Sequence, residues 1–181
     1  MYIGDKMKEN IILVGLSACG KTTLGKEVSK RLKVNFIDCD NVIEHKEGKS
    51  ISEIFKVSGE NYFRQLEKEL ISSFFQLQST VISTGGGMPI YNNNMELLKK
   101  IGVVIFLNTP IDTLISRNLK INNRPLIIGN TEEKIKNMYN HRVDIYRKAH
   151  YTLDTSNLNI EQSVDAIINL VKTHMNLQYI K

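Results

Sequence analysis

Short apolar runs alternate along the chain with longer amphipathic stretches. The clearest runs lie at 11–14 and 103–107, and shorter ones lie at 35–37, 80–83 and 151–153. Runs of this kind are typical of strands that are buried on both faces of a parallel sheet. The alternation therefore predicts an α/β fold, in which helices cover both faces of a parallel sheet.

The stretches between the runs have helical periodicity. Leu24, Val28 and Leu32 recur at intervals of four residues, so they share one face of a helix that ends at about residue 33. The long interval between the second and third predicted strands also has helical apolar faces. We expect this insertion, at about 40–76, to build a wall of the substrate site. Further helices are predicted at about 131–149 and after the last strand.

The length favours one domain. A chain of 181 residues with 41% hydrophobic content can bury one core but is short for two. We therefore expect a single domain over 1–181. The stretch at about 118–130 is polar and basic, contains the step Arg124-Pro125, and lies between two helical patterns. It is predicted to be a mobile lid.

Charge and targeting signals narrow the classes of protein further. The formal net charge is +5 and the pI is about 9.1, but Lys and Arg are interleaved with Asp and Glu along the chain. This favours an anion site on an ordinary surface over nucleic-acid binding. No apolar run approaches the roughly 20 residues that span a bilayer, and no signal region follows the N-terminal charges. We expect a cytoplasmic protein without a membrane segment. Cys19 and Cys39 have no metal-ligand spacing, and a disulfide is the weaker interpretation.

Residues 15–22, Gly-Leu-Ser-Ala-Cys-Gly-Lys-Thr, match the pattern G-x-x-x-x-G-K-[ST]. The pattern follows a predicted buried strand and opens a predicted helix, which is the context a phosphate-binding loop requires. Backbone N–H groups and the helix N-terminus would then face the phosphates. Lys21 would contact the β- and γ-phosphates, and the Thr22 hydroxyl would bind Mg²⁺. The sequence therefore predicts ATP binding.

Two carboxylates and a glycine triplet follow the next predicted strands. Because ligands bind at the carboxyl ends of parallel strands, these residues are expected to meet the phosphate loop. Asp38 and Asp40 would face the same side if the strand continued, one reaching the metal and the other a substrate hydroxyl. Helix capping or a turn is the alternative. Gly85-Gly86-Gly87 would allow close approach of the backbone to a ligand.

Separated arginines are candidates for binding anions. Arg64 and Glu67 are three residues apart on a predicted helix, so the glutamate could orient the arginine toward a carboxylate. Of Arg142 and Arg147 only one is expected to point inward. Arg124 could neutralise the phosphoryl group during transfer. The four histidines share no metal-ligand spacing and are expected to be structural or exposed.

These segments together resemble the shikimate kinase family, within the nucleoside-monophosphate-kinase-like branch of phosphate-loop enzymes. The resemblance extends from about residue 11 to 171, and its segments occur in family order. They are Gly20-Lys21-Thr22-Thr23, 36–40, 59–67, Thr84-Gly85-Gly86-Gly87, Arg124-Pro125-Leu126, and Arg142 with Tyr146. The resemblance implies a P-loop kinase fold: a three-layer α/β/α arrangement with a five-stranded parallel sheet in the order 2-3-1-4-5.

The resemblance also implies a reaction and a set of site residues. The expected reaction converts shikimate and ATP to 3-phosphoshikimate and ADP, in the pathway to chorismate and the aromatic amino acids, in a monomer that requires Mg²⁺. Asp38 with Thr22 resembles the metal site, and Asp40 resembles the residue that binds the attacking hydroxyl. The implied shikimate ligands are Asp40, Arg64, Gly85, Gly86, Gly87 and Arg142. The implied ATP ligands are Ala18, Cys19, Gly20, Lys21, Thr22, Thr23, Arg117 and Arg124, with Lys21, Asp40 and Arg124 catalytic.

Two other kinds of function remain as alternatives from the residues alone. A kinase for gluconate or for a nucleoside monophosphate would share the phosphate loop and the lid, but not the helix around Arg64 together with the glycine triplet. A regulatory protein that binds ATP or nucleic acid without transferring phosphate would explain the basic pI. It would not need the carboxylates and arginines described above.

Overall fold

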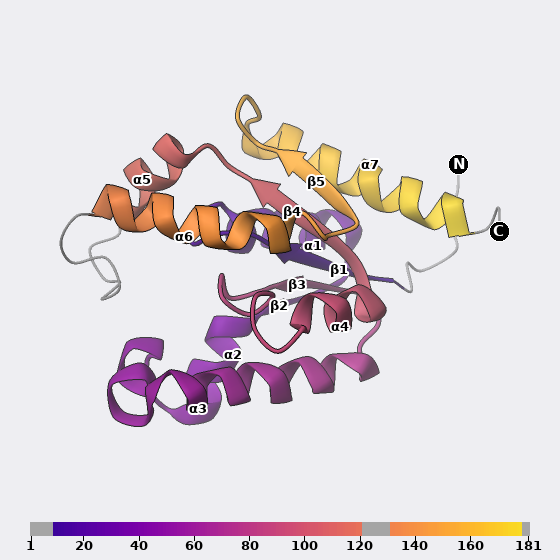
Figure 1. The fold of residues 1–181 in the computed structure, drawn as a ribbon. Helices are drawn as coiled ribbons and strands as arrows, with labels where there is room; N and C mark the ends of the chain where they lie inside the picture. The colour runs from indigo at the N-terminus through magenta and orange to yellow at the C-terminus, as the bar shows by residue number, and fades with distance from the viewer. Residues whose placement is uncertain (1–8, 121–130, 179–181) are drawn as a thin grey trace.

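A five-stranded parallel sheet forms the centre of the structure (Figure 1). The computed structural model describes residues 9–120 and 131–178. The strands are β1 (Asn10–Val14), β2 (Asn35–Asp38), β3 (Thr80–Ser83), β4 (Gly102–Asn108) and β5 (Tyr151–Asp154). Their order across the sheet is β2-β3-β1-β4-β5, and every neighbouring pair is parallel. The predicted sheet and its order are confirmed.

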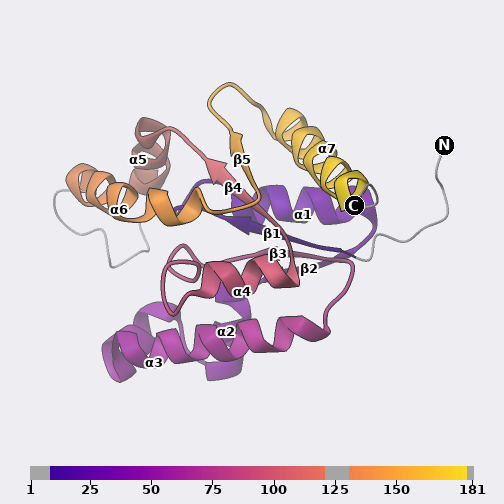
Figure 2. The same ribbon diagram turned by 45° about the vertical axis from the view of Figure 1, so that its right-hand side comes forward.

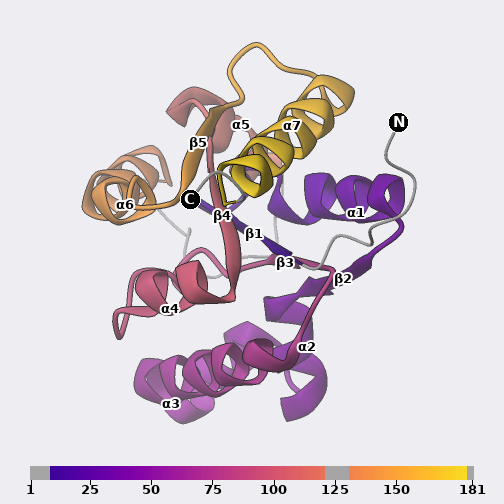
Figure 3. The same ribbon diagram turned by 90° about the vertical axis from the view of Figure 1, so that its right-hand side faces the viewer.

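Helices cover both faces of this sheet. They are α1 (Lys21–Leu32), α2 (Cys39–Glu47), α3 (Ile51–Ser73), α4 (Asn94–Ile101), α5 (Ile111–Lys120), α6 (Thr131–Tyr146) and α7 (Ile160–Gln178), with the 3₁₀ turn η1 (Phe74–Gln76) after α3. Helices α1 and α7 lie side by side on one face, and α4 lies on the other face with α3 beyond it (Figures 2 and 3). None of the helices in the described ranges combines the length and apolar character of a membrane span.

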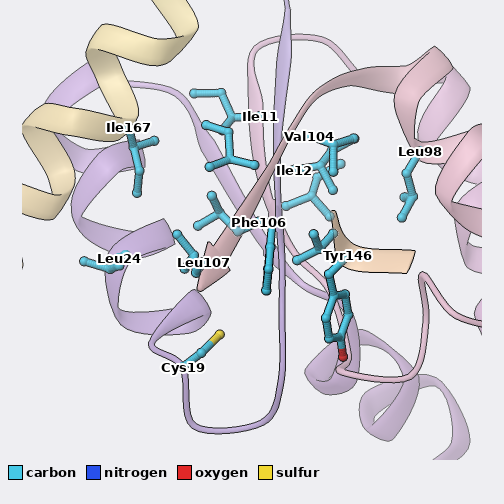
Figure 4. Close-up of a cluster of buried hydrophobic side chains, with 14 of the residues drawn as sticks. Ile11, Ile12, Cys19, Leu24, Leu98, Val104, Phe106, Leu107, Tyr146 and Ile167 are labelled. Atoms are coloured by element: carbon cyan, nitrogen blue, oxygen red, sulfur yellow. The ribbon is translucent and has the colours of Figure 1, made fainter. Parts of the chain in front are cut away.

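The core lies on both sides of the two central strands. All five residues of β1 are buried, as are six of the seven in β4. Leu24 and Ile167 pack on one side of β4, while Leu98 and Tyr146 pack on the other (Figure 4). Burial on both faces explains why these two strands were the clearest apolar runs in the sequence. The edge strands β2 and β5 are only partly buried.

The segment 40–76 contains most of α2, all of α3 and η1. Helix α3 begins with a capping box, in which the Glu53 N–H donates to Ser50 Oγ at 3.3 Å and the Ser50 N–H donates to Glu53 Oε2 at 2.8 Å. The helix is kinked at Gly59, whose φ of 80° and ψ of 172° are accessible essentially only to glycine. The kink sets the direction of the second half of α3, which carries Arg64 and Glu67.

One boundary and one helix differ from the sequence predictions. Helix α6 ends at Tyr146 rather than near residue 149, because Lys148 and Ala149 form tight i→i−3 bonds that turn the chain into β5. Helix α4 was not among the predicted elements. Cys19 and Cys39 are free and buried.

Candidate active site

The phosphate loop connects β1 to α1 in a conformation that requires small residues. Gly15 and Gly20 have φ of 143° and 101°, and Ala18 has φ of 66°. A Cβ atom on Gly15 would lie 2.9 Å from the Leu107 carbonyl oxygen, so a larger residue would displace the loop from β4. Helix α1 begins at Lys21, directly after Gly20 of the loop, so the N–H groups at its N-terminus can bind an anion there.

Lys21 is held inside the loop. Its Nζ donates to the carbonyl oxygens of Gly15 and Leu16, at 2.9 Å in both cases, and lies 3.6 Å from Cys19 Sγ. The Lys21 side chain is buried, so the loop carbonyls compensate its charge. This places an ammonium group inside the phosphate loop, where its charge can contribute to binding a phosphate.

Asp38 has two roles at the end of β2. Its Oδ1 accepts the N–H groups of Asp40 at 3.2 Å and Asn41 at 3.4 Å, so it caps α2. Its Oδ2 accepts the Thr22 hydroxyl at 2.6 Å. The strand does not continue to Asp40, since β2 ends at Asp38 and helix α2 begins at Cys39; the same-side argument therefore does not apply, although both aspartates line the cleft at the phosphate loop.

The oxygen atoms of Thr22 and Asp38 fit a magnesium ion. Both are hard donors of the kind that Mg²⁺ prefers, and they meet at the phosphate loop. Within 9–120 and 131–178, no cluster of three or more His, Cys, Asp or Glu side chains could hold a metal by itself. A bound Mg²⁺ would therefore complete its shell with phosphate oxygens and water, as is usual for nucleotide sites.

Asp40 lies at the first turn of α2, against the glycine triplet. A Cβ atom on Gly85 would lie 2.5 Å from Asp40 Oδ1 and 3.3 Å from Glu67 Oε1. Gly85 is therefore required so that these two carboxyl groups can approach the backbone. The negative charge of Asp40 is one of the causes that raise the pKa of Glu67.

The Arg64 guanidinium is enclosed by two glutamates. Its Nη1 donates to Glu67 Oε2 at 2.8 Å, and its Nε and Nη2 donate to Glu60 Oε1 at 3.1 and 2.8 Å. A Cβ atom on Gly87 would lie 2.5 Å from Arg64 Nη1. The charged head of Arg64 therefore lies directly against the last glycine of the triplet.

Glu67 is the buried member of this group. Burial raises its pKa to about 7, although the Arg64 charge opposes the shift. Burial acts to lower the pKa of Arg64, but the same ion pair raises it more. The cost of burial therefore outweighs the ion pair for the Glu67 carboxyl group and does not for the Arg64 guanidinium. Oε1 of Glu67 is buried and has no hydrogen-bond partner among the described residues.

Arg142 acts on the same group from helix α6. Its positive charge opposes the burial that raises the pKa values of Glu67 and Tyr146, and it adds to the hydrogen bonds that lower the pKa of Glu60. The Tyr146 hydroxyl donates to the Gly86 carbonyl at 2.6 Å, and burial raises the Tyr146 pKa, so the hydroxyl stays a donor. Arg147 is exposed, and its Nη1 lies 3.5 Å from Asp144 Oδ1. The prediction that only one of these two arginines points inward is consistent with this arrangement.

A cleft of about 530 Å³ follows the phosphate loop. Asp40 and Gly86 line it, and so do Arg117, Thr155 and Leu158. Arg117 Nη1 donates to the Ala18 carbonyl at 3.2 Å. Arg64 and Arg142 are not part of this lining: Arg64 lies against Gly87, and Arg142 acts on Glu60 and Glu67. The cleft is therefore suited to a nucleotide, and a second region beyond the triplet is suited to an anionic acceptor.

Comparisons with known proteins identify the family. The family model described as shikimate kinase matches residues 17–172. The chain belongs to the shikimate kinase family. It is 47% identical over 166 residues to a shikimate kinase of Clostridium botulinum strain Langeland, covering 91% of this chain and 96% of that protein. It is 40% identical to a shikimate kinase of Thermodesulfovibrio yellowstonii, covering 88% and 93%.

A solved structure agrees with this assignment. The shikimate kinase from Acinetobacter baumannii in complex with shikimate has a TM-score of 0.88 and 34% identity, covering 93% of this chain and 96% of that chain. Membership of the shikimate kinase family makes the chain an enzyme, an ATP-dependent kinase that phosphorylates shikimate. The alternatives, a kinase for another acceptor and a regulatory binding protein, are thereby set aside.

The structure brings together most of the residues that the shikimate kinase resemblance implied. Lys21, Thr22 and Asp38 meet at the phosphate loop, and the glycine triplet joins Asp40 to Arg64. Arg124 and most of the predicted lid lie outside the described residues. Glu60 was not predicted, although its position four residues before Arg64 on a helix could have revealed it.

Proposed function

We propose that the chain transfers the γ-phosphoryl group of ATP in line to the 3-hydroxyl of shikimate, which is held by Arg64, Arg142 and Gly86. The observation that carries this proposal is the convergence of both guanidinium groups on Glu60 and Glu67 beside the glycine triplet. Two cations that act on one small region can bind the carboxylate of an anionic acceptor, through fork-shaped contacts.

The nucleotide occupies the cleft at the phosphate loop in this proposal. Lys21 exchanges contacts with the loop carbonyls for contacts with the β- and γ-phosphates, and Thr22 with Asp38 holds Mg²⁺. The donors from Ala18 to Thr23 bind the phosphates, while Arg117 lies against the base. Mg²⁺ supplies positive charge to the phosphate oxygens when it is bound.

Asp40 orients the attacking hydroxyl. It lines the nucleotide cleft and lies against Gly85, so it stands between the two substrates. During the reaction the shikimate oxygen bonds to the γ-phosphorus, the bond from phosphorus to the bridging oxygen breaks, and ADP leaves. The hydroxyl proton passes to the Asp40 carboxylate as the new bond forms. Arg124, Lys21 and the helix N-terminus balance the charge on the moving group.

The remaining assignments extend the same proposal. The segment 40–76 forms the wall of the shikimate site. Of the predicted lid at 118–130, residues 118–120 are the end of helix α5, and 121–130 with Arg124 lie outside the described residues. The protein acts as a monomer in the cytoplasm. It does not bind nucleic acid, because its basic residues are interleaved with acidic ones.

The role of Asp40 is tested by Asp40→Asn in a coupled assay of ADP release. The expected result is a fall in kcat of about 10²- to 10⁴-fold, the usual size for general-base assistance, with an unchanged KM for ATP. Asp144→Asn, at an exposed aspartate, is the matched control and should retain wild-type turnover. Wild-type turnover in Asp40→Asn would refute the role. An acceptor screen with shikimate, gluconate and nucleoside monophosphates tests the substrate, and only shikimate should release ADP.

A further inference from the structure

The ring of Tyr91 covers one face of the Arg64 guanidinium. The Cζ atom of Arg64 lies 4.0 Å from the centre of this ring, compared with 5.3 Å for Phe63 and 5.8 Å for Phe55. A cation at this distance from an aromatic face is attracted by the ring quadrupole, and more so where water is excluded. Only 12% of the Arg64 side chain is exposed, so Tyr91 makes the closest of three aromatic contacts to a mostly desolvated charge.

The loop that carries Tyr91 is fixed by hydrogen bonds and backbone geometry. Asn94 is fully buried, and its Nδ2 donates to the Met88 carbonyl at 2.9 Å. The Asn94 N–H donates to the Tyr91 carbonyl at 2.9 Å. Asn92 and Asn93 both have left-handed conformations, with φ of 53° and 57°, which asparagine tolerates better than most residues. The loop therefore returns the chain over the glycine triplet in one defined conformation.

Tyr91 also interacts with the glutamate that binds Arg64. Hydrogen bonding to Arg64, and then to the Tyr91 hydroxyl, lowers the pKa of Glu60. The guanidinium thus has Glu60 and Glu67 at its edge and Tyr91 on its face. Gly87 also lies close to it, since a Cβ atom there would be 2.9 Å from Arg64 Cζ. The group is held on several sides by two segments of the chain, helix α3 and the loop between β3 and α4.

The hydrogen bonds to the glutamates leave part of Arg64 for a ligand. A guanidinium carries five N–H donors. Three of them are used by Glu60 and Glu67, which leaves one on Nη1 and one on Nη2. Those two donors bind an acceptor carboxylate well only if the plane of the guanidinium is fixed, because the rotamer freedom of a long side chain otherwise weakens the contact.

We propose that Tyr91 is a positioning residue for shikimate, whose ring fixes the plane of the Arg64 guanidinium so that its two remaining donors meet the substrate carboxylate. This inference rests on the proposed role of Arg64 as a ligand of that carboxylate. The sequence contains no signal for it, since Tyr91 is 27 residues away from Arg64 along the chain. The contribution of Tyr91 to shikimate binding should depend on its aromatic face and only weakly on its hydroxyl.

The experiment compares Tyr91→Leu with Tyr91→Phe. Tyr91→Leu should raise the KM for shikimate roughly tenfold, within a range of about 2- to 30-fold expected for loss of a cation–π contact, with the KM for ATP unchanged. Tyr91→Phe should stay within about twofold of wild type, because it keeps the ring. Tyr151→Leu is the matched control: Tyr151 lies on the edge strand β5 and its ring packs edge-on against His174, so the KM of this variant for shikimate should not change.

A double variant separates this inference from the proposed role of Arg64. In an Arg64→Ala background, Tyr91→Leu should cause no further rise in the KM for shikimate. An equal rise in both backgrounds, or no rise in Tyr91→Leu alone while Arg64→Ala has a large effect, would overturn the role of Tyr91. No effect of Arg64→Ala would instead overturn the carboxylate site itself. If Tyr91→Leu does not fold, Tyr91→Gln has similar length without an aromatic face and gives the same comparison.

Discussion

The hydroxyl of Thr22 donates a 2.6 Å hydrogen bond to Oδ2 of Asp38, while Oδ1 of the same carboxylate caps helix α2. The first contact joins the phosphate loop to the second strand, and the other fixes the carboxylate group in place. One side chain therefore caps the helix and also contacts the phosphate loop, so the two roles that the sequence left as alternatives are compatible. The cap orients the oxygen that we propose binds Mg²⁺.

Asp38→Asn should separate these two functions. Asparagine caps helices about as well as aspartate, so the free energy of unfolding should change by less than about 0.5 kcal/mol. A neutral amide is a weaker ligand for Mg²⁺ than a carboxylate, so the Mg²⁺ concentration for half-maximal activity should rise about tenfold or more. Denaturant unfolding and a Mg²⁺ titration of ADP release measure the two effects. An unchanged titration curve would contradict the proposed metal site.

Arg142→Ala should weaken shikimate binding selectively. Charged hydrogen bonds to a carboxylate contribute about 1.5–3 kcal/mol, so the KM for shikimate should rise about 10- to 100-fold while the KM for ATP stays near wild type. Arg147→Ala is the control, because Arg147 lies one residue beyond the end of the same helix, is exposed, and has its Nη1 3.5 Å from Asp144 Oδ1. Steady-state kinetics of both variants decide the point, and equal effects at the two positions would contradict the assignment.

Gly87→Ala should displace the Arg64 guanidinium. The added Cβ would lie 2.5 Å from Nη1 and 2.9 Å from Cζ, so the arginine must move away from the triplet. We expect the KM for shikimate to rise at least tenfold with little change in the KM for ATP. Gly48→Ala is a control of the same type: nothing lies within 4 Å of its added Cβ, although its φ of 63° should lower stability by about 1 kcal/mol. Its kinetics should match those of wild type.

The fold was predictable because its central strands are buried on both faces. The continuous apolar runs at 11–14 and 103–107 correspond to β1 and β4, at the centre of the sheet. The sheet order came from the family resemblance, since periodicity alone does not determine which strands are neighbours. Helix α4 was not predicted, because its eight residues give only two turns of periodic signal.

The candidate site was predictable where a motif determines local geometry. The spacing of the phosphate loop placed Lys21 and Thr22 correctly, because the loop and the first turn of α1 are continuous in sequence. The spacing of Asp38 and Asp40 did not determine their geometry, since an i, i+2 spacing indicates the same side only within a strand and β2 ends at Asp38. Contacts made by Tyr91 depend on how the loop after β3 returns over α3, and no local pattern carries that information.

Glu67 makes the stability of the protein depend on pH. Burial raises its pKa from 4.5 to about 7 in the folded state, while the unfolded chain exposes it to water. Between these two values the folded state retains a proton that the unfolded state has released. The free energy of unfolding contributed by this group is therefore largest below pH 4.5, falls as pH rises, and is lost above about pH 7.

Glu67→Gln should remove this dependence. A difference of one in pKa corresponds to about 1.4 kcal/mol, so the stability gained by wild type between pH 7 and pH 4.5 from Glu67 is on the order of 3 kcal/mol. Urea unfolding at several pH values measures it. In Glu67→Gln the free energy of unfolding should fall less steeply between those pH values than in wild type, whereas Glu27→Gln, at an exposed position on α1, should retain the wild-type slope. An identical slope in Glu67→Gln and wild type would show that Glu67 is ionised throughout this range. The buried carboxyl group would then owe its charge to Arg64 and Arg142, which outweigh the cost of burial.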